Sequence, residues 1–138
     1  VFTQRPVVSG LTVETVLEMG QLYSPLSPSQ RSDERQRLAI QFGISHLSQT
    51  SIETLSDGEF QKMMIARALL QDTPVILLDE PTAFLDYVAK EEIMQLLKES
   101  AHTSKKLILF SSHDLELAGR YADEIFDFDL IVASSKIA

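Results

Sequence analysis

The chain has 138 residues, of which 44% are hydrophobic and 23% charged, so its length and composition fit one folded domain of modest size. Its formal net charge of -8 argues against a nucleic-acid-binding surface, which usually shows as a basic stripe. The lack of cysteine excludes a disulfide framework and a thiolate zinc site, and no apolar run approaches the roughly 18 residues of a membrane-spanning helix.

The first half of the chain is predicted to be helical. Residues 11–20 carry apolar side chains at helical spacing, with Thr12 as the predicted N-cap and Gly20 at the position of a C-terminal cap. A Ser- and Pro-rich loop then leads into a surface helix that is expected to end near Gly43. A third helix follows the sequence "LSDGE" and is closed from outside by Pro74.

Strand and helix patterns alternate in the second half of the chain. The predicted elements are a strand at 75–79, a helix at 86–100, a strand at 106–112, a helix at 114–122 and a strand at 124–132. Asp86 is the expected N-cap of the longer helix. Both "VILLD" and "KLILFSS" are continuous apolar runs, which is typical of strands buried on both faces. This alternation predicts an α/β fold with a parallel sheet.

Titratable side chains follow two of the predicted strands. Asp79 and Glu80 end the first strand, and His113 follows the second. In a parallel sheet, ligands bind outside the carboxyl ends of the strands. Asp79 suits a hard cation such as Mg²⁺, Glu80 can hold an attacking water, and His113 can contact a phosphoryl oxygen. Taken alone, the acid pair is equally well interpreted as a strand end that reaches solvent, and His113 as a capping residue.

The sequence "LSDGE" has a structural and a functional interpretation. Ser56 and Glu59 form a capping-box pattern at the start of a helix, and for this motif by itself that structural interpretation is favoured. The same helix N-terminus is also a potential anion-binding site. Gly58 in the first turn costs about 1 kcal/mol relative to alanine. Close approach by a ligand would explain why glycine stands there.

Together these motifs resemble those of the nucleotide-binding subunit of an ABC (ATP-binding cassette) transporter. "LSDGE" resembles the signature motif of that family, "VILLDE" its Walker B strand and "AFLD" its D-loop. His113 stands at the position of the switch histidine, and Gln4 in "VFTQRP" stands at that of the Q-loop. The motifs follow the order of the family, and the resemblance covers residues 1 to about 129.

The resemblance implies the α/β fold of the P-loop NTPases in its ABC-ATPase form. Residues 1–138 are then a partial ABC ATPase domain, with the Q-loop region at about 1–10 and a helical subdomain that carries the signature motif at 11–72. Residues 73–138 supply Walker B, the D-loop and the switch histidine as part of the parallel-sheet core.

The resemblance also implies roles in binding and hydrolysing ATP with Mg²⁺. Asp79 helps to hold the metal, and Glu80 is the general base for the water that attacks the γ-phosphate. His113 contacts the γ-phosphate. Gln4 senses metal and water at the catalytic site and links that site to the membrane subunit.

Other motif residues are implied to bind nucleotide across a head-to-tail dimer. The set consists of the D-loop residue Asp86 and the signature residues Ser56, Asp57, Gly58 and Glu59, which face ATP held by the opposite subunit. The two acids of the signature depart from the usual neutral pattern. This acidic variant resembles one in importers of iron siderophores, haem and cobalamin.

A second departure concerns the phosphate-binding loop GxxxxGK[ST], which wraps phosphates in backbone amides and supplies a Lys. None of the five glycines in the sequence is followed by Lys. We therefore expect the chain to be the C-terminal portion of an ATPase domain, which on its own is inactive and binds neither ATP nor Mg²⁺.

The function implied for the full-length protein is that of the ATP-binding and hydrolysing subunit of an ABC importer, with an iron-siderophore-type metal chelate as the expected cargo. Its expected partners are transmembrane permease subunits, a second ATPase subunit and, indirectly, a periplasmic or surface binding protein, but no nucleic acid. Its expected location is the cytoplasmic face of the inner membrane. Two alternatives stay open, namely a non-transport ABC ATPase of translation or DNA repair and a non-catalytic interaction module derived from the family.

Overall fold

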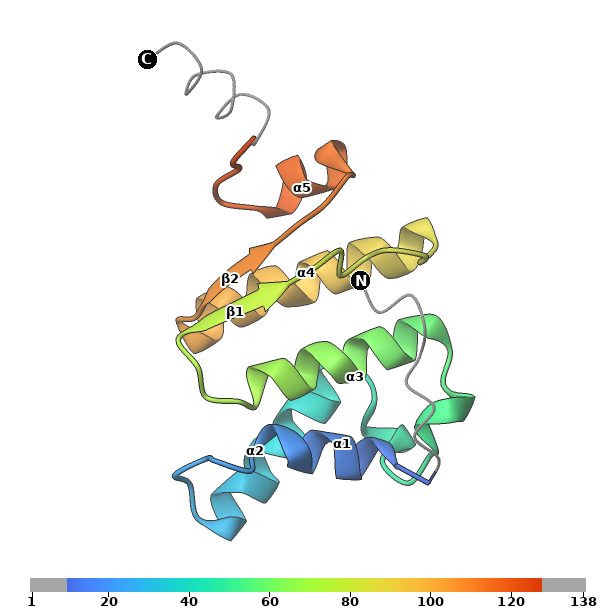
Figure 1. Ribbon diagram of the computed structural model, residues 1–138, viewed down its shortest axis with the longest axis vertical. Coiled ribbons are helices and arrows are strands. Elements are labelled where there is room, and N and C mark those ends of the chain that lie inside the picture. The colour runs from blue at the N-terminus through green and yellow to red at the C-terminus, as the bar shows by residue number, and fades with distance from the viewer. Residues whose placement is uncertain (1–9, 128–138) are drawn as a thin grey trace.

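A computed structural model describes residues 10–127, in which a helical part is followed by two parallel strands and two further helices (Figure 1). The elements are α1 (Val13–Gly20), α2 (Pro28–Gln41), the 3-10 helices η1 (Ser45–Leu47) and η2 (Ile52–Thr54), α3 (Asp57–Leu69), β1 (Val75–Leu78), α4 (Tyr87–Ser104), β2 (Leu107–Phe110) and α5 (Leu115–Tyr121). None of the helices within the described range is long and apolar enough to cross a membrane.

Two sequence predictions fall at the ends of the chain. Gln4 lies outside the described residues, as does the greater part of the strand predicted at 124–132. Residues 124–127 do lie within them, and they form no strand. The described sheet consists of β1 and β2 alone, so the apolar residues Ile125 and Phe126 have no partner strand there and stay exposed.

Helix α1 begins as predicted but ends differently. The Thr12 side chain caps it by accepting a hydrogen bond from the Thr15 backbone N–H at 3.3 Å. Gly20 is the last helical residue and Gln21 is the C-cap, so the predicted capping role of Gly20 is wrong. Gly20 is instead buried against α3, where an added Cβ would lie 2.7 Å from the carbonyl oxygen of Arg67. The glycine therefore allows α1 and α3 to approach closely.

Helix α2 begins and ends with local signals in the sequence. Ser27 and Gln30 form a capping box at its start. Gly43, with a φ of +67°, follows its end in the left-handed conformation that glycine adopts readily, which confirms that the helix ends near this residue. An ion pair at 3.0 Å between Arg35 and Glu14 joins α2 to α1.

Helix α3 lies between the helices α1 and α2 on one side and α4 on the other (Figure 1). The α3 residues buried there are Met63, Ile65, Ala66 and Leu69. They belong to one hydrophobic cluster that also includes Phe42 from the helical part and Ile93 and Leu97 from α4. The same core therefore supports the helical part and the α/β part of the described chain.

Strands β1 and β2 pair in parallel, as the sequence predicted. Their register runs from Val75 opposite Leu107 to Leu78 opposite Phe110. Ser111 continues the pairing, because its backbone N–H donates to the carbonyl oxygen of Leu78 at 3.0 Å. Helix α4 packs behind the two strands (Figure 1). Both strands therefore end at the same edge of the sheet.

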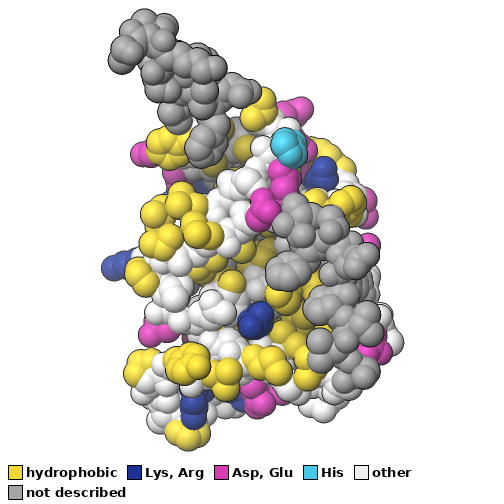
Figure 2. All heavy atoms as spheres, viewed as in Figure 1, with side chains coloured by type: hydrophobic (Ala, Val, Ile, Leu, Met, Phe, Trp, Pro, Cys, Tyr) yellow, Lys and Arg dark blue, Asp and Glu magenta, His cyan; other side chains and the backbone are white. Residues whose placement is uncertain are grey.

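The prediction that these strands are buried on both faces is wrong for the described chain. Val75, Leu77, Leu107 and Leu109 alternate with the inward-facing residues and are exposed, Leu77 to 74% of its surface. Figure 2 shows hydrophobic side chains gathered over the two strands. Among the described elements α4 covers one face of the sheet, so the continuous apolar run reflects a second face that these elements leave open.

The close packing at Gly20 leads to a test of stability. Gly20→Ala should lower the free energy of unfolding by about 1–3 kcal/mol, because the new methyl group overlaps backbone of α3 that cannot easily move. Urea unfolding measures this change. The matched control is Gly119→Ala in α5, where an added Cβ meets no atom within 4 Å and alanine should be neutral or slightly stabilising. Equal effects of the two substitutions would contradict the packing role of Gly20.

Candidate functional site

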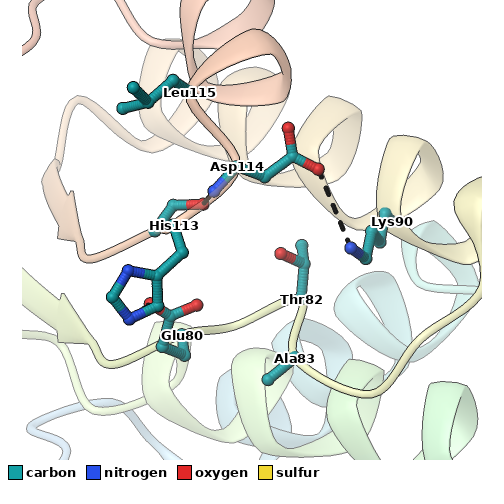
Figure 3. Close-up of a pocket in the computed structure, with 8 residues that line it drawn as sticks. Glu80, Thr82, Ala83, Lys90, His113, Asp114 and Leu115 are labelled. Carbon is teal, nitrogen blue, oxygen red and sulfur yellow. Dashed lines mark hydrogen bonds and ion pairs between the residues drawn. The ribbon is translucent and has the colours of Figure 1, made fainter.

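Glu80 and His113 follow separate strands, as the sequence predicts, and they meet at the carboxyl edge of the sheet. The Nε2 atom of His113 lies 3.4 Å from Oε1 of Glu80 (Figure 3). The two side chains differ in exposure, since that of Glu80 is 17% exposed and that of His113 is 99% exposed. The Glu80 side chain is thus packed against the protein, whereas the His113 imidazole is open to a ligand.

Ser111 joins the two acids of this edge and was missed by the sequence analysis. Its hydroxyl donates to Oδ1 of Asp79 at 2.7 Å and accepts a hydrogen bond from the backbone N–H of Glu80 at 2.9 Å. The only sequence signal was a pair of serines directly before His113. A serine after a strand has many possible partners, so the sequence alone could not indicate which it contacts.

The backbone at Glu80 adopts an uncommon conformation. Its φ of 49° lies in the left-handed region, which is uncommon for a residue other than glycine. The following residues Pro81 and Thr82 are buried, so the loop after β1 is anchored in the protein. Backbone strain of this kind persists where the surroundings hold it in place. Here the Ser111 hydroxyl and the buried residues supply that support.

His113 is positioned by the residue that follows it. Asp114 caps α5, its Oδ1 accepting from the Leu117 backbone N–H at 3.0 Å, while its Oδ2 lies 3.7 Å from Nζ of Lys90 (Figure 3). Lys90 belongs to α4, so this ion pair connects the histidine loop to the helix that begins after the D-loop sequence. These contacts fix the loop backbone and leave the imidazole itself exposed.

A shallow pocket of about 400 Å³ lies between these elements. It is bordered by the loop after β1, by Lys90 of α4 and by the start of α5, with Glu80 and His113 on its wall. Among the described residues that line it, none comes from the signature sequence. The pocket therefore joins one cation, one imidazole and two carboxylates, of which Asp114 is paired with Lys90 and Glu80 lies beside His113. The imidazole and the Glu80 carboxylate can contact a phosphate group and a water molecule.

The signature residues lie at the start of α3, next to α4. Ser56 and Glu59 form the predicted capping box. Ser56 donates its backbone N–H and its hydroxyl to the Glu59 carboxylate, each at 2.8 Å, and these bonds lower the pKa of Glu59 below its ordinary value. A Cβ at Gly58 would lie 4.0 Å from that of Ala89, which is an ordinary contact. Packing within the described chain thus does not require glycine there.

Asp86 lies at the start of α4, as predicted, and caps it. Its Oδ1 accepts a hydrogen bond from the Ala89 backbone N–H at 2.8 Å. An ion pair at 2.7 Å between Lys62 of α3 and Glu92 of α4 holds the two helices together near these ends. The structure therefore brings the signature sequence close to the D-loop helix, and Asp79, Glu80 and His113 form a second group at the sheet edge.

The sheet edge fits Mg²⁺ that is held largely by a substrate. No three Asp, Glu or His side chains in residues 10–127 converge into a metal cage. Mg²⁺ commonly binds through one or two carboxylates together with phosphate oxygens and water. The Asp79 carboxylate is a hard oxygen donor of that kind, and the Ser111 hydroxyl holds one of its oxygens in place. The residues present therefore suit a metal that arrives with a nucleotide.

Comparisons with known proteins define the class. The family model for the ABC transporter matches residues 1–83. The chain is 37% identical over 121 residues to the achromobactin transport ATP-binding protein of Dickeya dadantii, covering 84% of this chain and 45% of that protein. It is 38% identical over 120 residues to the petrobactin import ATP-binding protein of Bacillus anthracis, covering 84% of this chain and 44% of that protein.

The solved structures agree with this class. CbiO1 of Clostridium perfringens, which is part of the ABC transporter complex CbiONQ, matches with a TM-score of 0.73 and 29% identity, covering 81% of this chain and 45% of that one. The chain therefore belongs to the ABC transporter family, and its fold is that of the ABC ATPases, as the motifs predicted. It spans less than half the length of these relatives.

The capping box leads to a prediction about pH. Because the pKa of Glu59 in the folded chain is below its ordinary 4.5, its contribution is fully present above pH 4.5 and is lost as the pH falls through the folded pKa. Between about pH 5 and pH 3, Glu59→Gln should therefore lose less unfolding free energy than the wild type. Urea unfolding at each pH provides the measurement.

The control for this experiment is Glu53→Gln, which replaces an exposed acid outside the capping box. This variant should follow the wild-type pH dependence. If Glu59→Gln and the wild type lost stability in parallel, the charged cap would not be a source of the acid sensitivity.

Proposed function

We propose that this chain serves as the ATP-hydrolysing part of an ABC transporter that imports its cargo. The observation that carries the proposal is the approach of Glu80 and His113, from two parallel strands, to 3.4 Å at the carboxyl edge of the sheet. Hydrolysis also requires the phosphate-binding loop, which the printed sequence does not contain. The proposal concerns the chain in a protein that carries such a loop, and residues 1–138 alone should hydrolyse no ATP.

In the proposed reaction, Glu80 is the general base. Its carboxylate orients a water molecule toward the γ-phosphate and accepts the proton that the water releases. The Nε2–H of His113 donates a hydrogen bond to a γ-phosphate oxygen. Asp79 helps to hold Mg²⁺, which when bound offsets phosphate charge. Gln4 is proposed to contact the metal and the water, and to link this site to the permease.

The signature residues are proposed to act on the nucleotide of a second subunit. Ser56 and Gly58 lie at the start of α3, where the helix dipole favours an anion. An added Cβ at Gly58 would meet only Ala89 at 4.0 Å, so glycine is explained by approach of a phosphate from outside the described chain. Asp57, Glu59 and Asp86 are proposed to lie at the same interface of a head-to-tail dimer.

Cargo, partners and location follow from the relatives and are part of the proposal. Two of those relatives are named for transport of achromobactin and import of petrobactin. We propose an iron-siderophore-type chelate as cargo for this chain. Its partners would be transmembrane permease subunits and, indirectly, a periplasmic or surface binding protein. The protein would then lie at the cytoplasmic face of the inner membrane, with residues 11–42 of the helical subdomain, hinged at Gln4, forming the groove that receives a cytoplasmic helix of the permease.

The role of Glu80 can be tested in the complete ATP-binding subunit assembled with its permease. Glu80→Gln should lower kcat for ATP by about 100-fold or more, because removal of a general base typically has an effect of this size. Nucleotide affinity should stay close to that of the wild type. Steady-state hydrolysis and nucleotide titration measure the two quantities. The control is Glu116→Gln, an exposed acid on α5. Near wild-type hydrolysis by Glu80→Gln would exclude Glu80 as the base.

Docking to the permease can be tested by crosslinking, because the chain has no cysteine of its own. Tyr23, in the loop between α1 and α2, is 99% exposed. A cysteine at this position should crosslink to a cysteine in a cytoplasmic loop of the permease. The control is a cysteine at Ile125, which is 54% exposed and lies after α5. Crosslinks formed only by the Ile125 variant would show that the docking surface is elsewhere.

A further inference from the structure

The hydroxyl of Ser111 is shared by two groups that act differently in hydrolysis. It has one hydrogen, which it donates to Oδ1 of Asp79 at 2.7 Å, and lone pairs, one of which accepts the Glu80 N–H at 2.9 Å. An ionised carboxylate only accepts hydrogen bonds, and a backbone N–H only donates them. The direction of both bonds is therefore set by chemistry, and the serine hydroxyl can serve both partners at once.

The two bonds act on a segment that needs support. Glu80 has a φ of 49°, and the direction in which its side chain leaves the strand depends on this backbone conformation. A bond to the Glu80 N–H restrains the peptide that carries the side chain, whereas a bond to Asp79 restrains a carboxylate oxygen. Ser111 itself is held by the sheet, through its N–H bond to Leu78 at 3.0 Å. A fixed point on β2 thus orients two acids that follow β1.

We propose that Ser111 is a positioning residue for hydrolysis, which sets the relative placement of the Asp79 carboxylate and the Glu80 backbone. This inference rests on the function proposed above, because it assumes that Asp79 and Glu80 serve the metal and the water. Ser111 itself forms and breaks no bond in the reaction. It acts by fixing the Asp79 carboxylate, which is proposed to bind the metal, relative to the Glu80 peptide, which carries the proposed base. Misplacement of a reacting group by an ångström can lower a rate by about 100-fold.

The neighbouring serine has a different function in the structure. The Ser112 hydroxyl accepts a hydrogen bond from the Asp114 backbone N–H at 3.0 Å, which shapes the turn into α5. Of the two adjacent serines, Ser111 therefore binds the acids that follow β1, and Ser112 binds the loop that carries His113. A hydroxyl is needed at position 111 in particular, and threonine can replace serine there because the exposed position has room for a methyl group.

The test compares three variants of the complete ATP-binding subunit assembled with its permease. Ser111→Ala removes the shared hydroxyl, and Ser111→Thr retains it. Thr73→Ala is the matched control, because the Thr73 hydroxyl also bonds to β1, donating to the Val75 carbonyl oxygen at 3.0 Å, but at the opposite end of the strand. Ser111→Ala should lower kcat for ATP at least about tenfold and leave KM within about threefold, because positioning acts on the chemical step. Ser111→Thr and Thr73→Ala should stay within about threefold of the wild type in both constants.

A second readout does not depend on hydrolysis. The exchange rate of the Glu80 amide hydrogen can be measured by NMR in the nucleotide-free complete subunit, labelled with ¹⁵N-glutamate. Ser111→Ala should raise that rate by about tenfold or more, because the amide loses its acceptor. The rate should be unchanged in Ser111→Thr and in Thr73→Ala. A general loss of folding would raise the exchange of other labelled glutamates as well, and these serve as internal references.

The outcomes separate this inference from the proposed function. Unchanged kcat and unchanged Glu80 exchange in Ser111→Ala would overturn the role of Ser111, as would a threonine variant as impaired as the alanine variant. A rise in KM at constant kcat would also overturn it. Failure of the wild-type subunit to hydrolyse ATP, or full activity of Glu80→Gln, would instead overturn the proposed function. In that case the Glu80 exchange rate still decides whether Ser111 holds the backbone at Glu80.

Discussion

The parallel pairing of β1 with β2 is the constraint on which the candidate site depends. Leu78 lies opposite Phe110, so the residues that follow, Asp79 and Ser111, leave the sheet side by side. An antiparallel pairing or a shift of register would separate the acids of one strand from the serine and histidine of the other. The hydrogen bonds at Ser111 and the contact between Glu80 and His113 are therefore consequences of the register.

A sheet of two short strands is only marginally stable by itself, so this register must be held by other elements. Its inward face is covered by α4, and residues such as Ile93 and Leu97 belong to the same core as the buried side of α3. The outward face stays apolar and exposed at Leu77 and Leu109. Strands of parallel sheets are normally covered on both faces. The described elements therefore leave open a face whose composition suits burial.

Local signals made much of the fold predictable from the sequence. The capping box at Ser56 and Glu59, the N-caps Thr12 and Asp86, and the parallel strand order all depend on residues close together in the chain or on alternation of elements. The positions of Glu80 and His113 directly after two predicted parallel strands likewise predict that they lie at one edge of the sheet.

The features that were missed depend on residues far apart in the sequence. The sequence predicts a cap at Gly20, and only the structure shows the carbonyl oxygen of Arg67 beside it. The contacts of Ser111 could not be predicted, because its partners Glu80 and Asp79 lie 31 and 32 residues earlier in the sequence. Burial of both sheet faces was expected from apolarity, but composition shows that a face is suited to burial and does not identify what covers it.

The contrast between Glu80 and His113 suggests how binding and chemistry divide between the two strands. Glu80 is largely enclosed and its backbone is held by Ser111, so its carboxylate enters the proposed reaction already oriented. His113 is almost fully exposed, and its Nε2 lies near the Glu80 carboxylate. This Nε2 is also the atom that is proposed to contact a phosphate. An arriving phosphate would therefore compete with Glu80 for this imidazole. Transfer of the His113 contact from Glu80 to phosphate would leave the carboxylate free for water, so that the base becomes available when the substrate is in place.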